Sequence, residues 1–428
     1  MELVPLLKDK RILLGVTGGI SAYKTCTLAS HLTQAGAVVD VVMTEAATRF
    51  VAPLTFQALT GRPVYTDLWE TPGEGVPSHI AHIGLAHAAD LLVIAPITAN
   101  TMAKLAQGSA DNLLTTAALA ASCPMVAAPA MDVGMWAHPA TQANAATLRE
   151  RGVHFAGPAR GRMASGLEGE GRMLEPDAIL GHVRWVLGRD GPLTGRRVIV
   201  TAGPTRETID PVRFLSNPSS GRQGFALAQA ALDRGAAVTL IAGPTHLATP
   251  IGAHRVNVTT AQEMYEAVIA DAGQADVLLM AAAVADYRPA DAAAQKIKKG
   301  KDDLNLRLAR TRDVLSAVAV RWAETRSPRV VVGFAAESQD LIPNARAKLA
   351  AKNLDLIVAN DVTAPDAGFA ADTNRVVILG RGGDVEELPL MSKGAVAEAI
   401  LDRVESLLKK ASGQPGNERP RPDRSHPA

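Results

Sequence analysis

An aspartate and a run of lysines, ten residues apart, are the side chains in this sequence with the clearest capacity for chemistry. Asp286 directly follows the apolar run 277–285, and the basic segment 296–299, of sequence KIKK, comes after it. A nucleoside triphosphate needs Mg²⁺, which favours carboxylate oxygens, and it needs cations to offset the charge of departing pyrophosphate. A lysine run alone is more often a solvated surface. Together with Asp286, it indicates a site for a nucleotide and its metal.

A loop of small residues supplies a second candidate anion site. The apolar run 198–200 ends in a long loop that includes Asn217-Pro218-Ser219-Ser220-Gly221, and the helical pattern 224–232 follows. Small residues and potential helix caps thus sit where backbone N–H groups can face an anion. The same pattern is compatible with an ordinary strand-to-helix connection, in which Asn217 only caps the helix. Spacing alone does not separate the two interpretations.

The first half of the chain contains a similar turn. The apolar run 12–16 leads into Thr17-Gly18-Gly19-Ile20-Ser21, a helical pattern over 23–34 and a second apolar run over 38–43. Strand, glycine turn, helix and strand form a βαβ unit whose glycines let a phosphate approach the helix N-terminus. The turn lacks the G-x-G-x-x-G fingerprint, and no acidic residue stands where a dinucleotide ribose would bind. We therefore expect a mononucleotide.

These turns belong to two α/β domains in tandem. Strands alternate with helices in both halves, which is typical of doubly wound, mainly parallel sheets of the flavodoxin-like or Rossmann-like kind. A glycine–proline hinge at 190–193 and a polar tail rich in proline and arginine give the boundaries. We expect domains at 1–190 and 191–410 and a disordered tail at 411–428. The expected strands are 12–16, 38–43, 91–95, 125–128, 198–201, 238–241, 277–281, 330–333, 356–359 and 376–379, and the expected helices include 23–34, 112–121, 141–151, 176–189 and 224–232.

Composition excludes several other classes of protein. The 428 residues are 20% charged and 47% hydrophobic with a net charge of +1, so no overall field favours nucleic acid or an anionic membrane. Cys26 and Cys123 are far apart and form no C-x-x-C pair, which suits a reducing compartment. No signal peptide is recognisable, and no apolar run approaches the about 20 residues of a membrane span. We expect a cytoplasmic protein that acts on small molecules.

The segments TAGPTRE (201–207) and DPVRFLSNPSSGRQG (210–224) closely resemble the opening of phosphopantothenate–cysteine ligase. The resemblance implies CTP as the nucleotide, Mg²⁺ at Asp286 and an acyl-cytidylate made from 4'-phosphopantothenate. It further implies that Lys296 aids attack of the substrate carboxylate on the α-phosphate, and that Asn217 stabilises the carbonyl oxygen of the intermediate while cysteine attacks. Thr311-Arg312 replaces an Asn-Pro pair that is common in the family. The other nucleotide contacts implied are Ala282, Arg312, Asp313, Val314, Leu315, Phe334, Lys348 and Lys352, of which the last two share a helix face.

The segments GVTGGIS (15–21), 82–116 and APAMDVGMWAHPATQ (128–142) resemble the flavin-dependent cysteine decarboxylases. In this order, the two halves resemble the bifunctional phosphopantothenoylcysteine decarboxylase/phosphopantothenate–cysteine ligase family. The resemblance implies FMN bound between the subunits of a trimer, with trimers joined through ligase-domain dimers into assemblies as large as a dodecamer. A histidine in HIAHIGLAH is by itself more often structural, but the match makes His82 the group that deprotonates or orients the substrate thiol while FMN accepts a hydride, before CO₂ leaves. The FMN contacts implied are Gly18, Gly19, Ile20, Ser21, Thr44, Pro96, Thr98, Asn100 and Met102.

Two further catalytic candidates depart from the family pattern. Asp132 stands where an asparagine commonly holds the substrate carboxylate, so the site would need a raised Asp132 pKa, another donor or a different geometry. Ser165 stands where a flexible flap often carries cysteine, which is the better proton donor. Either this is tolerated variation, with Ser165 relaying a proton through water, or the first half is an FMN-binding scaffold or regulator beside an active ligase. A nicotinamide-dependent reductase is a third alternative, disfavoured because neither glycine turn has the dinucleotide fingerprint.

Overall fold

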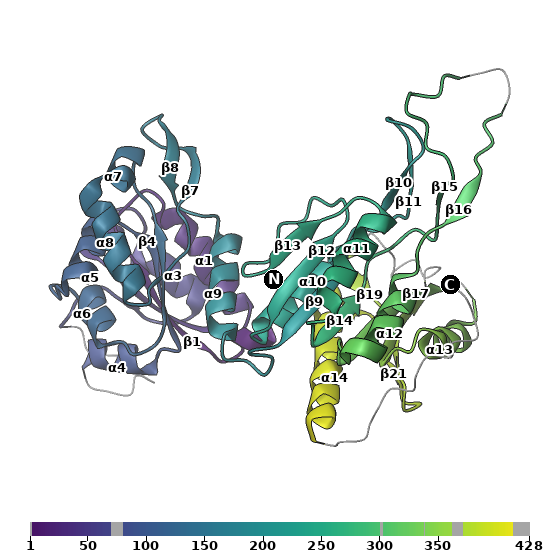
Figure 1. The fold of residues 1–428 in the computed structure, drawn as a ribbon. Helices are drawn as coiled ribbons and strands as arrows, with labels where there is room; N and C mark the ends of the chain where they lie inside the picture. The colour runs from purple at the N-terminus through teal and green to yellow at the C-terminus, as the bar shows by residue number, and fades with distance from the viewer. Residues whose placement is uncertain (1, 70–79, 300–302, 338, 362–370, 414–428) are drawn as a thin grey trace. The chain divides into compact units, whose positions relative to one another are not determined.

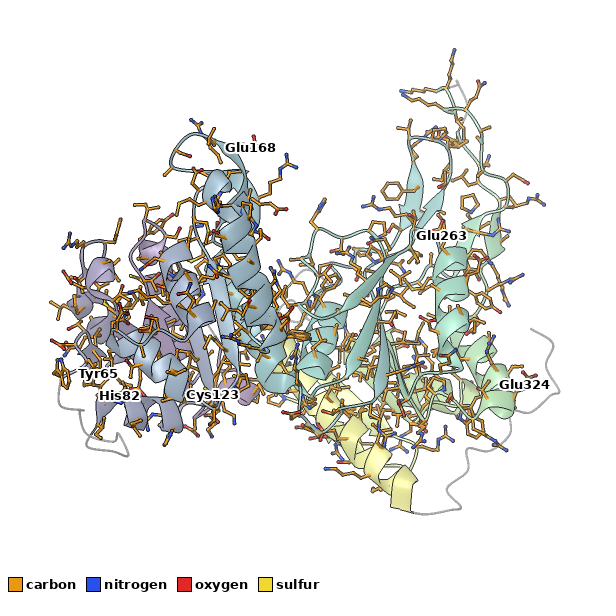
Figure 2. All side chains as sticks on the ribbon, turned by 60° about the vertical axis from the view of Figure 1, so that its left-hand side comes forward. Tyr65, His82, Cys123, Glu168, Glu263 and Glu324 are labelled. Carbon is orange, nitrogen blue, oxygen red and sulfur yellow. The ribbon has the colours of Figure 1, made fainter. Side chains whose placement is uncertain are left out.

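The computed structural model describes residues 2–69, 80–299, 303–337, 339–361 and 371–413. The chain divides into two compact units, Met1–Gly188 and Arg189–Ala428. Figure 1 shows their ribbon and Figure 2 their side chains. The division lies within two residues of the boundary expected at residue 190. The last helix continues to Gly413, beyond the expected start of the tail at 411, and residues 414–428 lie outside the described part of the chain.

The described part of the first unit contains one parallel sheet with the strand order β3-β2-β1-β4-β5-β6. From β1, the next strands β2 and β3 follow toward one edge of the sheet. From β4, the next strands β5 and β6 follow toward the opposite edge, so the strand order reverses between β1 and β4. Ligands of doubly wound sheets bind beyond the carboxyl ends of the strands at such a reversal. The strands are β1 Arg11–Val16, β2 Val38–Met43, β3 Val64–Tyr65, β4 Leu91–Ile97, β5 Met125–Pro129 and β6 His154–Phe155. The helices are η1 Pro5–Leu7, α1 Ala22–Gln34, α2 Glu45–Thr48, α3 Pro53–Thr60, α4 Ala81–Ala88, α5 Ala99–Gln107, α6 Leu113–Ala120, α7 Val133–Ala137, α8 Pro139–Glu150 and α9 Pro176–Gly188.

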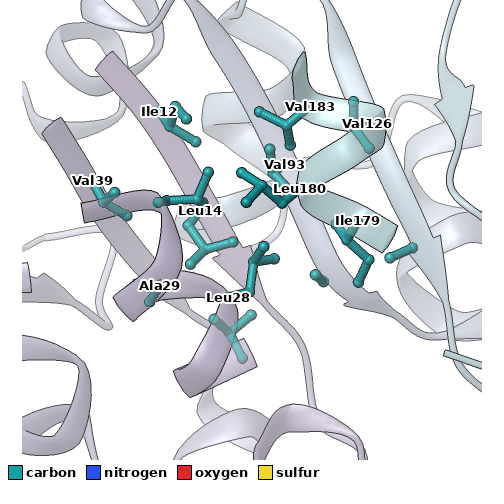
Figure 3. Close-up of a cluster of buried hydrophobic side chains, with 14 of the residues drawn as sticks. Ile12, Leu14, Leu28, Ala29, Val39, Val93, Val126, Ile179, Leu180 and Val183 are labelled. Carbon is teal, nitrogen blue, oxygen red and sulfur yellow. The ribbon is translucent and has the colours of Figure 1, made fainter. Parts of the chain in front are cut away.

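Apolar strands explain why this sheet is buried on both faces. The strand β4 is buried at every position, as expected for a central parallel strand covered by helices on both sides. On one face, Leu14 and Val93 pack with Leu28 of α1 and with Leu180 of α9 (Figure 3). The helix predicted at 176–189 therefore closes the core of the first unit.

The second unit repeats this architecture around a larger sheet, with the order β13-β12-β9-β14-β17-β18-β20-β21. The pairs from β13 to β18 are parallel, and β20 and β21 join antiparallel at one edge. The order again reverses between β9 and β14, so both predicted α/β domains are confirmed. The strands are β9 Arg197–Ala202, β12 Ala237–Ala242, β13 His254–Asn257, β14 Val277–Met280, β17 Val330–Glu337, β18 Leu356–Asp361, β20 Val376–Gly380 and β21 Val385–Glu387. The helices are α10 Arg222–Asp233, α11 Ala261–Ala272, α12 Val314–Thr325, α13 Leu341–Ala351 and α14 Lys393–Gly413.

Short antiparallel hairpins occupy segments in which the sequence predicts only loops. The predicted flap contains β7 Ala159–Arg162 paired with β8 Glu168–Arg172. The long loop after β9 contains β10 Arg206–Thr208 paired with β11 Phe214–Ser216, and β10 packs beside β15 Tyr287–Pro289 (Figure 1). The remaining pairs are β15 with β16 Leu308–Arg310, and β19 Thr373–Asn374 with β22 Met391–Ser392.

The environment of the two cysteines and the character of the helices bear on the compartment of the protein. Cys26 and Cys123 are free thiols and half-buried, and burial raises the pKa of both. Within the described ranges, no helix combines the length and the apolar character needed to cross a bilayer.

One arginine fastens the last helix to the second unit. Arg234 ends α10, and its guanidinium donates to Glu398 at 2.5 Å, to Glu405 at 2.6 Å and to Asp402 at 2.6 Å, all on α14. Its side chain is only 12% exposed, and Glu398 and Glu405 are 19% and 14% exposed. Because these charges are largely removed from water, loss of the cation leaves costly carboxylates behind.

We therefore predict that Arg234→Met lowers the free energy of unfolding of the second unit by about 3 kcal/mol. The measurement is a urea titration in which hydrogen exchange of α14 reports on this unit. The matched control is Arg307→Met, because Arg307 pairs with Asp291 where the two side chains are 78% and 81% exposed. The control should leave the free energy of unfolding almost unchanged, because water screens this pair, and equal losses in the two variants would contradict the explanation.

Candidate functional site

The crevice of the first unit lies where β1 and β4 diverge, and Thr17 joins its two sides. The Thr17 hydroxyl donates to the Pro96 carbonyl at 2.7 Å and accepts from the Thr98 backbone N–H at 3.2 Å. Pro96 follows a cis peptide bond and is buried at the end of β4. The predicted contacts that follow β1 and β4 are therefore neighbours in space.

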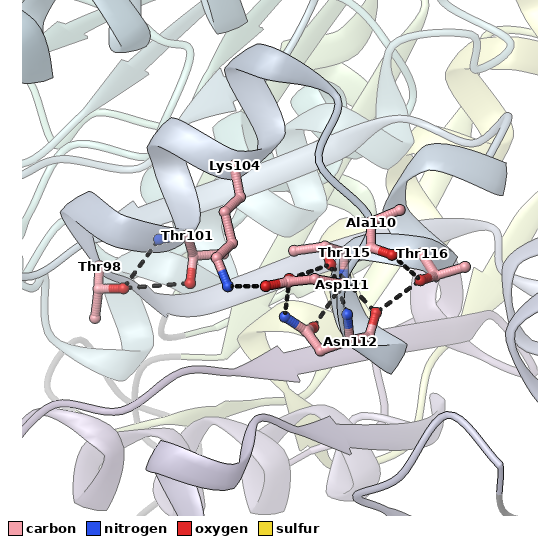
Figure 4. Close-up of polar contacts among 8 residues, drawn as sticks. All are labelled: Thr98, Thr101, Lys104, Ala110, Asp111, Asn112, Thr115 and Thr116. Atoms are coloured by element: carbon pink, nitrogen blue, oxygen red, sulfur yellow. Dashed lines mark hydrogen bonds and ion pairs between the residues drawn. The ribbon is translucent and has the colours of Figure 1, made fainter.

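Helix starts surround this crevice. Ser21 precedes α1, Thr44 caps α2 by accepting from the Ala47 N–H at 3.3 Å, and Thr98 caps α5 by accepting from the Thr101 N–H at 3.3 Å. Figure 4 shows the Thr98 cap together with the ion pair between Lys104 and Asp111, at 2.6 Å, which links α5 to the start of α6. Three helix N-termini at one strand edge favour an anionic group there.

The two glycines of the turn have different roles. A Cβ atom on Gly18 would lie 2.4 Å from the Ala46 Cβ and 2.9 Å from the Ala46 carbonyl carbon, so this glycine is required for packing against α2. A Cβ atom on Gly19 would meet only the Thr98 methyl group, at 3.9 Å. Gly19 therefore faces open space, as expected of a backbone that a ligand can approach.

The predicted cofactor contacts differ in how exposed their side chains are. Ile20 is 62% exposed and Asn100 is exposed, which leaves both side chains available at the crevice. Met102 is 0% exposed and packs in the apolar core beneath α5. Its helical spacing from Thr98 directs the side chain inward, so any contact of Met102 with a cofactor would be made through its backbone.

His82 lies on the first turn of α4 and is half-buried. Its Nδ1 atom is buried without a hydrogen-bond partner in the described structure. Figure 2 shows His82 well away from the β7–β8 hairpin that carries Glu168. Within one chain, the catalytic histidine candidate is therefore not assembled with the candidates at that hairpin.

Asp132 and Ser165 are joined directly. The Ser165 hydroxyl donates to Asp132 Oδ2 at 2.6 Å, and the other carboxylate oxygen accepts from the Gly134 N–H at 3.1 Å. The hydrogen bond from Ser165, followed by that from Gly134, lowers the pKa of Asp132. In the free chain, this shift is opposite to the raised Asp132 pKa that was one of the three solutions considered from the sequence.

The crevice of the second unit has an equivalent threonine. The Thr205 hydroxyl accepts from the Ala285 N–H at 3.0 Å, and the Thr205 N–H donates to the Ala283 carbonyl at 3.2 Å. Asn217 Nδ2 lies 3.4 Å from the carbonyl oxygens of both Ala283 and Val284. These bonds hold the loop after β9 against the loop after β14, which contains the predicted Ala282 and Asp286.

Asp286 and Lys296 are on connected elements but do not touch. Asp286 is exposed just before β15, and its backbone carbonyl accepts from the Thr311 N–H at 2.9 Å. Lys296 is exposed, and the next residue, Ile297, is hydrogen-bonded to the turn of the β10–β11 hairpin. In the described part of the chain, no contact joins the Lys296 amine to Asn217 or to Asp286. No group of three acidic, histidine or cysteine side chains suited to a metal occurs in that part either, so Asp286 supplies a single carboxylate.

The two lysines predicted to contact the nucleotide each bond to another candidate residue. Asp313 caps α12, and its carboxylate pairs with Lys352, which also donates to the Ser316 hydroxyl at 3.1 Å. Burial acts to raise the pKa of Asp313, but the hydrogen bonds from Lys352 and Ser316 outweigh it and the pKa is lowered. Lys348 donates to the carbonyl of Phe334 at 3.2 Å, and Phe334 is half-buried.

The residues next to Asp313 point in different directions. Arg312 lies over the Tyr265 ring, 5.2 Å from its centroid, so its guanidinium faces α11. Val314 is buried in the core and Leu315 packs against it, which leaves mainly their backbone for a ligand.

Sequence reasoning missed Thr17 and Thr205, although Thr17 directly follows β1 and Thr205 stands three residues after the end of β9. A cavity of about 330 Å³ lies at the opposite, amino end of the second sheet, between Arg197, His254 and Gln274. It contains none of the predicted residues, and the crevice is the better candidate because ligands of these sheets bind at the carboxyl edge.

Comparison with known proteins assigns a class to each unit. Residues 5–187 match the flavoprotein family, and residues 193–408 match the C-terminal domain family of DNA/pantothenate metabolism flavoproteins. The chain thus combines a flavoprotein domain with a pantothenate-metabolism domain.

Full-length relatives give the particular family. The chain is 48% identical over 408 residues to the coenzyme A biosynthesis bifunctional protein CoaBC of Bacillus subtilis (strain 168), covering 95% of this chain and 99% of that protein. It is 46% identical over 415 residues to the CoaBC protein of Mycobacterium tuberculosis (strain ATCC 25618 / H37Rv), covering 94% and 98%. A crystal structure of a CoaBC C-terminal domain is 40% identical, covers 51% of this chain and 99% of that one, and has a TM-score of 0.44. The chain belongs to the family of coenzyme A biosynthesis bifunctional proteins, and it is an enzyme that combines decarboxylase and ligase activities.

The Ser165–Asp132 contact leads to a prediction about the pH at which Asp132 is protonated. A carboxyl group with a lowered folded pKa stabilises the folded hairpin above its unfolded pKa of about 3.9, and this contribution is lost as the pH falls through the folded value. Ser165→Ala should raise the Asp132 pKa toward its ordinary value, without reaching it because the Gly134 N–H remains. The measurement is the ¹³C carboxyl shift of Asp132 against pH. Ser165→Thr keeps the hydroxyl and should keep the low midpoint, and an unchanged midpoint in Ser165→Ala would contradict the assignment.

Proposed function

We propose that this chain catalyses two consecutive steps in coenzyme A biosynthesis. The second unit joins 4'-phosphopantothenate to cysteine with CTP, through an acyl-cytidylate and with release of pyrophosphate and CMP. The first unit decarboxylates the resulting 4'-phosphopantothenoylcysteine to 4'-phosphopantetheine with FMN. The observation that carries the proposal is the crevice of the second sheet, where Asn217 reaches the backbone immediately before Asp286.

In the ligase step, Asn217 has the chemistry to stabilise a developing negative charge. Its amide nitrogen lies 3.4 Å from each of two carbonyl oxygens. Hydrogen bonds of this length are weak, so the amide can exchange them for a bond to a substrate oxygen. The exposed Asp286 carboxylate would hold Mg²⁺ together with the nucleotide phosphates, the usual arrangement for this ion. Lys296 would neutralise charge on the α-phosphate, and Lys348 and Lys352 would face the remaining phosphates.

Lys352 must exchange partners for this role. Its amine pairs with Asp313 in the described structure, so binding of a phosphate requires the amine to be shared with or withdrawn from that carboxylate. The same contact keeps Asp313 ionised before the nucleotide arrives.

The crevice of the first unit fits the phosphate of a flavin mononucleotide. Gly19 faces open space, the start of α1 supplies backbone N–H groups, and the caps at Thr44 and Thr98 stand beside it. When bound, FMN supplies hydride acceptance from the substrate and later hydride return. The protein's own residues position the substrate thiol, for which His82 is the candidate.

Separation of His82 from the hairpin supports a site built between copies of the chain. One copy would supply His82 and its neighbour would supply Asp132 and Ser165, which agrees with a trimer whose flavins lie between subunits. Assembly of trimers through ligase-domain dimers, up to a dodecamer, is part of the same proposal. The use of CTP leads us to infer a cytoplasmic location.

The Asp132–Ser165 pair bears on how the decarboxylase would work. Since Asp132 keeps its charge, the substrate carboxylate must be held by another donor or lie elsewhere. Since the Ser165 hydroxyl is engaged by Asp132, it relays a proton only after that bond exchanges. Both residues then act as a pair, and the alternative in which this half is only a scaffold remains an outcome of the test below.

A paired assay on the purified protein tests the proposal. With CTP, Mg²⁺, 4'-phosphopantothenate and cysteine, we expect one pyrophosphate and one CO₂ for each 4'-phosphopantetheine formed, by a protein with a flavin spectrum. Lys296→Ala should lower pyrophosphate release by about 100-fold or more, the scale of losing one transition-state charge contact, while CO₂ release from supplied phosphopantothenoylcysteine stays normal. Pyrophosphate without any CO₂ would support the scaffold alternative, and CO₂ without CTP-dependent pyrophosphate would contradict the ligase assignment.

A further inference from the structure

The turn of the β10–β11 hairpin is built around a buried carboxylate. Asp210 is 1% exposed, and one of its oxygens accepts from the backbone N–H groups of Val212 and Arg213, both at 2.8 Å. The other oxygen faces Arg213, which donates through Nε at 3.0 Å and through Nη2. The Arg213 guanidinium holds the pKa of Asp210 well below its usual range, although burial opposes this.

The second oxygen also holds a segment from much later in the chain. It accepts from the Ile297 N–H at 3.1 Å, while Arg213 Nη2 donates to the Ile297 carbonyl at 2.9 Å. A third bond, from the Ala293 N–H to the Ile209 carbonyl at 2.9 Å, fastens the same segment to the same turn. The backbone beside Lys296 is therefore docked on the hairpin through both its N–H and its carbonyl.

The two oxygens of the Asp210 carboxylate have different structural roles. The oxygen that faces Val212 and Arg213 completes the turn, which any short polar side chain could do. The oxygen that faces Ile297 accepts no backbone hydrogen bond from the turn itself. It binds the Arg213 side chain and the Ile297 N–H, and Arg213 in turn donates to the Ile297 carbonyl, so both contacts hold the segment 293–297. Lys296 itself is exposed. If its backbone were not held, the side-chain amine would occupy many positions, and few of them would suit the reaction.

We propose that Asp210, acting with Arg213, is a positioning residue for the ligase reaction, because it fixes the backbone that carries the Lys296 amine. The inference rests on the proposed role of Lys296. Asp210 does not touch the nucleotide in this account and acts only through the docked segment.

The decisive variant is Asp210→Asn. An asparagine keeps one oxygen for the Val212 and Arg213 amides, but its NH₂ group cannot accept from Ile297 or from Arg213. The turn is thus retained while the docking bond is lost. We expect kcat for CTP-dependent pyrophosphate release to fall by about tenfold or more, with the KM for CTP changed by less than about threefold, as for a contact made mainly in the transition state. Hydrogen exchange at Ile297 should become faster, while exchange in α14 stays slow.

A double-mutant cycle distinguishes positioning from general damage. If Asp210 acts through Lys296, then adding Asp210→Asn to Lys296→Ala should change the remaining rate by less than about twofold. Asp291→Asn is the matched control, because it makes the same exchange in the neighbouring exposed pair with Arg307 and should leave both kcat and exchange at Ile297 unchanged. Should Asp210→Asn fail to fold, Arg213→Lys tests the same docking, since a lysine cannot bridge Asp210 and the Ile297 carbonyl as the guanidinium does.

Two results would overturn the inference. The first is a kcat close to wild type in a folded Asp210→Asn protein, and the second is a loss that is fully additive with Lys296→Ala. Failure of the ligase proposal has a different signature, since the wild-type protein itself would then release no pyrophosphate from CTP and the positioning role would fall with it.

Discussion

Both crevices of this protein depend on the hydrogen bonds that the backbone N–H and carbonyl groups make where a parallel sheet reverses its strand order. At such a point two strands end side by side, and their loops leave in opposite directions with polar groups that need partners. In the first unit Thr17 serves both loops through one hydroxyl, as donor to Pro96 and acceptor from Thr98. In the second unit Thr205 bonds to Ala283 and Ala285 in the corresponding place. The loops are therefore held together before any ligand binds, and the residues that they carry are presented at one edge.

A structural feature could be predicted from the sequence where a short run of residues determines it, and could not where residues far apart in the chain determine it. Central strands such as β4 and β14 are continuous apolar runs, so their positions and the parallel sheets follow from the sequence. The β10–β11 hairpin could not be predicted because its strands are short, polar and stabilised by Asp210, whose partners include a residue 87 positions away. The burial of the Met102 side chain could not be predicted either, because a motif match does not tell which face of a helix a side chain occupies. The candidate sites could be placed at the carboxyl edge of each sheet from the sequence, but the contact between Asp132 and Ser165 required the fold of the flap.

The two departures from the family pattern are best understood as one change. A lone aspartate in place of asparagine would bring an uncompensated charge to the site. Here the charge is shared between the Ser165 hydroxyl and the Gly134 N–H, so it stays ionised without burial. Serine at 165 is equally explained by Asp132, because a hydroxyl donates a stronger hydrogen bond than a thiol. The pair also ties the tip of the β7–β8 hairpin to the start of α7, which couples flap position to the state of this carboxylate.

The central claim is that the reversal between β9 and β14 forms the nucleotide site, and hydrogen exchange of the full-length protein with and without CTP and Mg²⁺ tests it most directly. Our account predicts slower exchange on CTP binding in the segments 203–205, 217–221, 283–286 and 313–316, which meet at the carboxyl edge of the second sheet. Exchange near the cavity between Arg197, His254 and Gln274, at the amino edge, should not change. Protection confined to that cavity, or to the crevice of the first unit, would contradict the account.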